Sequence, residues 1–261
     1  MSSQRDVIAE IEKQGTIFGH PKGLYLLFFT ELWERFSYYG MRAILILYMT
    51  KLWIENGLNI PESSATLIYG FFTGFVYFTP IIGGWIADRY IGQRNAITIG
   101  GITMFIGQLV LFSMNTHVGL AIGLVLLIIG NGFFKPNIST LLGNFYSEDK
   151  YKDKKDEGYN IFYMGINVGA FICNFFGAAL QILLGWQYAF MAAGVGMFIG
   201  VIVFLLGTKH YGNQTEKKGV QPGDMPFWKI VLFILVPSAV FGVIGWLIKG
   251  VTSEANPGGY I

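Results

Sequence analysis

The chain has 261 residues, of which 53% are hydrophobic and 13% charged, against about 25% charged residues in typical soluble domains. Its formal net charge of +2 is too small to indicate nucleic-acid binding. The single cysteine, Cys173, lies in an apolar stretch, which excludes a disulfide within the chain and favours a buried side chain over redox chemistry. The 35 glycines and 23 phenylalanines are typical of closely packed membrane helices.

Apolar stretches long enough to cross a bilayer, which takes about 20 residues of helix, recur along the chain. Residues 1–22 come first and are polar, and they indicate a cytoplasmic tail rather than a signal peptide. Six apolar stretches follow, at 23–50, 65–87, 96–115, 118–145, 159–184 and 187–207. We therefore predict an all-α membrane protein with a bundle of six transmembrane helices over residues 23–208.

The end of the chain contains a seventh apolar segment. Residues 209–225 form a polar linker, and the segment at 227–249, within 226–261, opens after Pro226, a residue suited to the first turn of a helix. We expect one further apolar helix there, which either spans the membrane or lies beside the bundle.

The distribution of lysine and arginine predicts the orientation, since cytoplasmic loops accumulate both. One side receives only Lys51. The other side receives Arg5, Lys13, Lys22, Arg89, Arg94, Lys150, Lys152, Lys154, Lys155, Lys209, Lys217, Lys218 and Lys229. We expect a multi-pass protein of the cell membrane with its amino terminus and the linker in the cytoplasm.

Ionisable residues inside the predicted spans are the most informative, because they are costly in lipid unless they face a bundle interior or a watery cavity. The first span contains four and the fourth span one: Glu31, Glu34, Arg35, Arg42 and Lys135. At 100° per residue, the four of the first span and Tyr38 share one stripe about 100° wide. The first span is therefore predicted to have one polar face.

Lys135 precedes Pro136 in the fourth span. Proline removes a backbone donor and allows a kink. Within the spans, only Glu31 or Glu34 could serve Lys135 as a carboxylate partner. Protonation of a glutamate would release its basic partner for a substrate carboxylate, which would link proton and substrate occupancy. The alternative is a static ion network that stabilises the fold.

The fifth span repeats a polar stripe without charge. Asn160, Tyr163, Asn174 and Gln181 lie within about 60° of one another relative to Asn167. An interhelical hydrogen-bond seam is one interpretation, and a binding surface that includes Asn167 is the other.

Four motifs, in order, carry a resemblance to a known family. Residues 31–40 (ELWERFSYYG) resemble the ExxERFxYYG motif of the proton-dependent oligopeptide transporter family, a branch of the major facilitator superfamily. Residues 83–92 (GGWIADRYIG) resemble that superfamily's cytoplasmic loop between helices two and three. Residues 133–139 (FFKPNIS) and 166–170 (INVGA) resemble the family's fourth- and fifth-helix patterns.

This resemblance implies the fold and the activity. The six spans match the amino-terminal half of a twelve-helix transporter, a half built from two three-helix units of inverted topology. The family imports di- and tripeptides as proton-coupled symporters that work by alternating access, with the proton as coupling ion and with no cofactor or metal. The other half would supply the second wall of the cavity, so we expect that this chain alone does not transport.

The resemblance also implies roles for individual residues. The proton-linked network would consist of Glu31, Glu34, Arg35 and Lys135. Arg35 and Lys135 would lie near the peptide carboxylate, and Arg42 would pair across the cavity with a carboxylate of the other half. The pocket lining would include Tyr38, Tyr39, Tyr77 and Asn167. Asp88 and Arg89 would stabilise one state of the transport cycle.

Some features depart from the family pattern. Gly70 stands where animal members carry a functional histidine, so proton coupling should depend on the carboxylates. His20, His117 and His210 all fall near predicted span ends, where we expect them to be solvated.

Two alternative functions stay open at this point. One is a carrier of nitrate or another small anion within the same family, and the other is a structural half-transporter that does not transport. An enzyme is disfavoured, because the sequence offers no metal-ligand cluster and no nucleophile with a base at suitable spacing.

Overall fold

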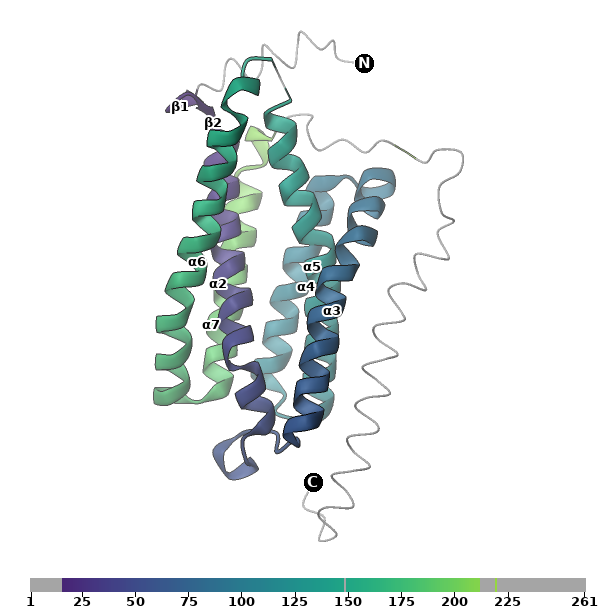
Figure 1. Ribbon diagram of the computed structural model, residues 1–261, viewed down its shortest axis with the longest axis vertical. Helices are drawn as coiled ribbons and strands as arrows, with labels where there is room; N and C mark the ends of the chain where they lie inside the picture. The colour runs from purple at the N-terminus through teal and green to yellow at the C-terminus, as the bar shows by residue number, and fades with distance from the viewer. Residues whose placement is uncertain (1–15, 148, 212–218, 220–261) are drawn as a thin grey trace.

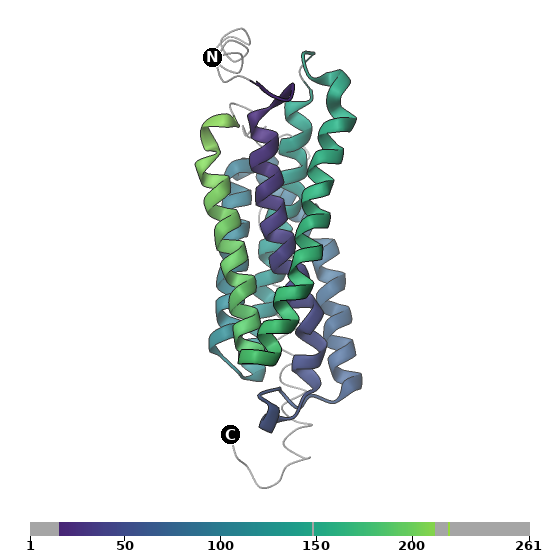
Figure 2. The same cartoon turned by 90° about the vertical axis from the view of Figure 1, so that its left-hand side faces the viewer.

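Six long helices lie side by side in the described part of the chain, residues 16–147, 149–211 and 219 of a computed structural model (Figure 1; Figure 2). They are α2 (Lys22–Thr50), α3 (Glu62–Ile86), α4 (Gln93–Ser113), α5 (His117–Phe145), α6 (Lys155–Leu184) and α7 (Trp186–Leu206). Each corresponds to one of the six predicted spans and begins or ends within a few residues of it. The seventh segment, 227–249, lies outside the described residues.

Short elements connect the helices. A two-stranded antiparallel ladder, β1 (Thr16–Ile17) and β2 (His20–Pro21), precedes α2. A π-helical turn at Ala87–Ile91 extends α3, and 3-10 turns lie at Trp53–Glu55, Lys152–Lys154 and Thr208–His210. Gly92 (φ 78°) separates α3 and its π turn from α4, in a backbone conformation that glycine adopts without steric cost. Thr116 caps α5, because its hydroxyl accepts a hydrogen bond from the Gly119 amide at 3.0 Å.

Within the described residues, five of the six helices are long and apolar enough to cross a membrane. The exception is α2, which is 29 residues long but carries Glu31, Glu34, Arg35 and Arg42. It is nevertheless packed against α6 and α7 along the bundle (Figure 2). The chain is thus a multi-pass membrane protein in which the most polar helix lies among apolar ones.

The helices divide in chain order into two three-helix units, α2 to α4 and α5 to α7, which pack on each other. The first helix of one unit, α2, packs mainly on α6 and α7, and the first helix of the other, α5, packs mainly on α3 and α4. The third helices, α4 and α7, pack on each other. The first helix of each unit therefore packs on the second and third helices of the other unit, as expected for two structurally related units.

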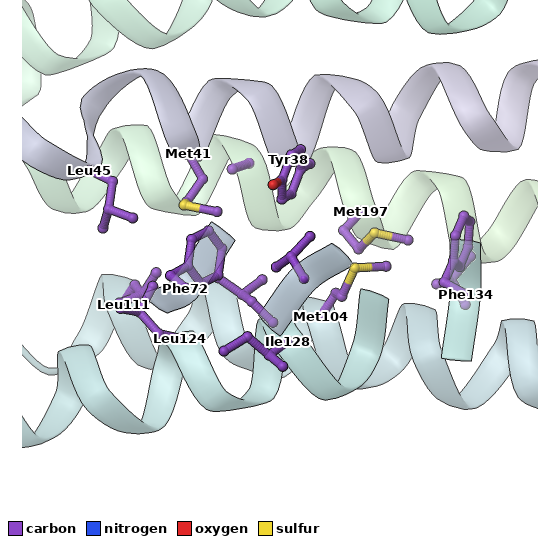
Figure 3. Packing of buried hydrophobic residues seen from close by; sticks show 14 of the residues in the cluster. Tyr38, Met41, Leu45, Phe72, Met104, Leu111, Leu124, Ile128, Phe134 and Met197 are labelled. Atoms are coloured by element: carbon purple, nitrogen blue, oxygen red, sulfur yellow. The ribbon is translucent and has the colours of Figure 1, made fainter. Parts of the chain in front are cut away.

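The apolar core lies between these layers. Figure 3 shows side chains of α2 (Tyr38, Met41), α3 (Phe72) and α5 (Ile128) converging with Met104 of α4 and Met197 of α7. At the crossing of α4 and α5 the backbones nearly touch: a Cβ on Gly100 would lie 2.6 Å from the Gly130 carbonyl oxygen. Glycine at such crossings lets two helices approach closely. Close van der Waals packing then holds the helices together in lipid, where no hydrophobic driving force acts between them.

Hydrogen bonds between connections hold each end of the bundle together. At the end that carries most of the lysines and arginines, here called the basic end, Asn144 Nδ2 donates to Gln93 Oε1 at 3.1 Å. At the opposite end, Trp186 Nε1 donates to the Glu55 carbonyl at 3.0 Å, and the Tyr48 hydroxyl donates to Asn115 Oδ1 at 2.8 Å. Among the described residues, the connections before α2, between α3 and α4, and between α5 and α6 lie at the basic end (Figure 1).

Candidate functional site

A cluster of three buried charges lies on α2. Arg35 Nε is 3.0 Å from Glu31 Oε1 and is also ion-paired with Glu34 Oε2. The three side chains are at most 4% exposed. Glu31 and Arg35 are one helical turn apart, so the period of the helix brings them together, as the polar stripe predicted. The cluster is enclosed by protein rather than open to water in this chain.

The carboxylates of this cluster have free acceptor capacity. Glu31 Oε2 and both oxygens of Glu34 accept no geometrically satisfactory hydrogen bond from the described residues. Buried carboxylate oxygens without donors are costly. They are also the atoms at which a proton would bind.

The position of α2 against α6 fixes the cluster in the bundle. A Cβ on Gly169 would lie 3.1 Å from the Arg35 Cβ and would overlap the Leu32 carbonyl. Gly169 belongs to the 166–170 pattern, so this motif brings α6 close to the charged stretch of α2. The same helix positions Asn167, two residues away.

Lys135 on α5 contacts an aromatic ring, not a carboxylate. Its Nζ lies 4.9 Å from the centroid of the Tyr77 ring of α3, a cation–π distance. Among the ion pairs of the described residues, Lys135 has none with Glu31 or Glu34, although its charge acts electrostatically on both. The predicted contact pair is therefore not formed in this conformation.

A second cation–π pair lies further along α2 and α3. The Arg42 guanidinium is 5.4 Å from the Tyr69 ring centroid, and its Nε donates a hydrogen bond to the Tyr69 hydroxyl. The sequence spacing of Tyr69 and Tyr77 is too loose to predict a shared face. Their pairing with Arg42 and Lys135 depends on how α3 lies beside α2 and α5.

The predicted pocket residues fall into two groups. Tyr38 is buried and stacks on Phe72, with ring centroids 6.4 Å apart (Figure 3). Both Tyr38 and the half-buried Tyr39 lie near Arg35, whose guanidinium carbon is 5.5 and 5.8 Å from their ring centroids. Tyr77 and Asn167 are exposed in this chain.

The polar stripe of α6 does not lie in the core. Asn160, Asn167 and Asn174 are all exposed on α6, and Asn174 Nδ2 donates to the Ala170 carbonyl of its own helix at 3.2 Å. An accessible polar surface therefore fits these side chains better than a seam within the bundle.

Two of the motifs meet where α3 crosses α5. A Cβ on Gly83 would overlap the Gly132 carbonyl, and one on Gly84 would lie 3.3 Å from the Pro136 Cβ. Asn137 Nδ2 donates to the Phe133 carbonyl at 2.7 Å and reaches the Gly83 carbonyl at 3.4 Å. This contact was not predicted, although both segments carry glycines that permit a close approach, Gly83 and Gly84 on α3 and Gly132 on α5.

Asp88 and Arg89 lie away from the charge cluster. They belong to the π-helical turn at the basic end, where Arg89 Nη1 donates to the Gly219 carbonyl at 3.1 Å. This position is at the junction of α3 and α4, and the role of the two residues in stabilising one state of the transport cycle stays a prediction.

The prediction of solvated histidines is wrong for His20. Its side chain is only 4% exposed, because the start of α2 packs against the ends of α5 and α6. His117 is half-buried, and its Nε2 lies 3.1 Å from the Leu58 carbonyl oxygen.

Together these features define a polytopic helical membrane protein with a buried charge cluster on its first long helix. Comparison with known proteins identifies the family. The model of the POT family matches residues 94–240, more than half of the chain, and the chain belongs to this family.

Individual relatives show how far the similarity extends. The "Uncharacterized transporter YclF" of Bacillus subtilis (strain 168) is 41% identical over 203 residues, which is 78% of this chain and 41% of the relative. The "Di-/tripeptide transporter" of Lactococcus lactis subsp. lactis (strain IL1403) is 35% identical over 243 residues, which is 92% of this chain and 48% of that transporter. The chain thus spans about half the length of the curated relatives it matches.

A solved structure has the same fold. A mutant of the peptide transporter POT in complex with alafosfalin superposes with a TM-score of 0.79 at 36% identity, covering 94% of this chain and 50% of that structure. The all-helical membrane fold predicted from the sequence is confirmed.

Proposed function

We propose that this chain is the amino-terminal half of a proton-coupled symporter that imports di- and tripeptides by alternating access. The observation that carries the proposal is the buried cluster of Glu31, Glu34 and Arg35, in which two carboxylates share one guanidinium and either could accept a proton. A relative named as a di-/tripeptide transporter supports the choice of substrate. The remaining half would come from a further carboxy-terminal bundle of the same transporter.

In this mechanism the charges of α2 alternate between partners. When Glu34 is ionised, it holds Arg35. When it takes up a proton, the ion pair weakens, and Arg35 becomes available to a peptide carboxylate. Lys135, which has an aromatic neighbour and no contact ion pair among the described residues, is free to contribute a second positive charge. Proton occupancy and peptide occupancy are thereby coupled, and each affects the affinity for the other.

The rest of the site would recognise the peptide itself. Asn167 and Tyr77, which are exposed in this chain, would line the cavity, with Asn167 reaching the peptide backbone. Tyr38 and Tyr39 would shape the pocket through their contacts with Arg35, and Arg42 would meet a carboxylate of the other half. Asp88 and Arg89 would stabilise one conformation from the basic end.

The basic end is inferred to face the cytoplasm. It gathers the connections that carry the lysines and arginines, and such loops stay on the cytoplasmic side of a cell membrane. The amino terminus would then be cytoplasmic. No cofactor is needed, because the proton gradient supplies the driving force.

The test is uptake of labelled dialanine by the complete transporter in liposomes. Glu34→Gln should abolish uptake driven by a proton gradient and retain exchange between equal peptide concentrations. Glu55→Gln is the matched control, because Glu55 is exposed and pairs only loosely with Lys51, at 3.5 Å. Unchanged driven uptake in Glu34→Gln would show that the cluster is structural.

Competition experiments address the substrate. Unlabelled dipeptide should compete with dialanine, and nitrate should not. Competition by nitrate alone would favour the small-anion carrier. Liposomes that contain this chain without a second half should show no gradient-driven uptake.

A further inference from the structure

A buried histidine joins three helices at the basic end, outside the charge cluster. His20 Nδ1 lies 2.8 Å from the Tyr146 hydroxyl, and His20 Nε2 lies 3.6 Å from Glu157 Oε2. The His20 and Tyr146 rings also meet edge to face, with centroids 6.0 Å apart. His20 and Tyr146 are 4% and 1% exposed, whereas the Glu157 side chain is 70% exposed.

These contacts connect distant parts of the chain. His20 lies two residues before α2 begins, Tyr146 directly follows α5, and Glu157 is in the first turn of α6. The three helices carry the charge cluster, Lys135 and Asn167 respectively. A displacement of α2 or α5 at this end therefore breaks the buried His20–Tyr146 contact, and α6 packs on the same tyrosine, because a Cβ on Gly158 would overlap the Tyr146 ring.

We propose that His20 is a positioning residue of the transport cycle, whose bond to Tyr146 fixes the basic ends of α2, α5 and α6 relative to one another. The existence of the His20–Tyr146 bond does not depend on which substrate the protein transports. Its role in turnover rests on the function proposed above. Neither side chain touches the charge cluster, so the effect on transport acts through the positions of the helices.

The chemistry of the site favours a neutral imidazole. A carboxylate near Nε2 favours the tautomer with its proton on Nε2, which leaves Nδ1 to accept a hydrogen bond from the Tyr146 hydroxyl. The charged and titratable groups that face His20 are Lys154, Glu157 and Tyr146. Burial lowers the pKa of His20, Lys154 lowers it further, and Glu157 opposes both.

The sign of the pH dependence follows from that direction. The pKa of His20 is lower in the joined arrangement, in which His20 is bonded to Tyr146, than in the open arrangement, in which the imidazole is solvated. The open arrangement therefore binds more protons. The joined arrangement is therefore most stable above the ordinary histidine pKa and loses stability as the pH falls through that value toward the lowered one. Acidification of this end should release the three helices.

The first experiment measures thermal unfolding of this chain in detergent at about pH 8 and about pH 5. At the higher pH, Tyr146→Phe, which keeps the ring, should lower the Tm by about 2–4 °C, as expected for one lost buried hydrogen bond in a chain of this size. His20→Gln should cost a similar amount, and the double variant little more than either single one. Strictly additive losses would overturn the proposed bond.

Comparing the two pH values distinguishes a titrating His20 from a side chain that only contributes packing. The wild type should lose more Tm than His20→Gln between the two pH values, because only the wild type carries the titrating imidazole. Glu157→Gln is the control, and its exposed side chain should shift the Tm little at the higher pH. Identical pH profiles for wild type and His20→Gln would overturn the pH dependence.

The second experiment tests the role in turnover, in the complete transporter. Tyr146→Phe should change the maximal rate of dialanine uptake several-fold and leave the apparent affinity for dialanine unchanged, since Tyr146 lies outside the proposed pocket. An unchanged maximal rate, with the bond confirmed by the unfolding data, would overturn the positioning role. If the wild type transports no peptide, the proposed function fails instead, and the unfolding result still stands.

Discussion

The helices α2 and α5 occupy equivalent places in the two three-helix units, but their charged side chains have different kinds of partner. Both are 29 residues long, and each packs on the second and third helices of the other unit. On α2, the carboxylates of Glu31 and Glu34 share one counter-charge, the Arg35 guanidinium of the same helix. On α5, the single charge of Lys135 lies against the Tyr77 ring of a neighbouring helix.

This difference indicates which of the charges stabilise the fold. Arg35 is buried and ion-paired, so its removal leaves two carboxylates in a low-dielectric interior, where unpaired charge is expensive. Lys135 is half-buried and held by a cation–π contact, so its removal leaves no opposite charge in direct contact. The charges of α2 should matter for folding, and that of α5 mainly for function.

The largest expected effect is on α2. Arg35→Met should lower the free energy of unfolding by about 3–5 kcal/mol, the cost of breaking a buried ion pair from one side. The control is Lys51→Met, which breaks a pair whose side chains are 46% and 47% exposed and should cost under about 1 kcal/mol. Denaturant unfolding in detergent measures both. Equal losses would show that the buried ion pair of Arg35 stabilises the fold no more than the exposed pair of Lys51.

A smaller effect is expected where α5 meets α3. Gly83→Ala places a methyl group against the Gly132 carbonyl and should cost about 1–3 kcal/mol by overpacking. Gly74→Ala, on the same helix with nothing within 4 Å of its added carbon, should be neutral or stabilise by up to about 1 kcal/mol. The same unfolding assay compares them, and a loss no greater for Gly83→Ala would show that α3 and α5 tolerate separation.

Lys135→Ala removes the single charge of α5. Its loss of unfolding free energy should stay within about 0.5–1 kcal/mol, the value of an accessible cation–π contact. Gradient-driven dialanine uptake by the complete transporter should nevertheless be lost. Folding damage as large as that of Arg35→Met would instead support a static ion network and a structural half-transporter.

A similarly small effect on stability is expected at Tyr69. Tyr69→Phe removes the hydroxyl that accepts the Arg42 hydrogen bond and should cost about 0.5–1.5 kcal/mol. Tyr77→Phe keeps the ring that Lys135 contacts and should cost less. Unfolding of both variants checks the order, and a larger loss for Tyr77→Phe would point to an important contact of its hydroxyl.

Much of this fold was predictable because it depends on local periodicity. The six spans follow from runs of apolar residues, and the meeting of Glu31 with Arg35 follows from the 3.6-residue turn of one helix. The burial of His20 was not predictable, because it depends on Glu157 and on Tyr146, which is 126 residues away in the chain. A histidine near a span end is expected to be solvated, but packing against residues distant in the chain buries His20.

The sequence by itself determined the membrane class, the six helices and the polar stripe of α2, since hydropathy and helical period are properties of neighbouring residues. Its motifs also indicated the family. Only the tertiary structure decided that Lys135 contacts Tyr77 instead of a carboxylate, that Arg42 bonds Tyr69, and that His20 joins three helices. The physical reason is that these partners lie on different helices, whose separation and rotation are set by close contacts such as that of Gly83 with Gly132, not by the residues adjacent in the chain.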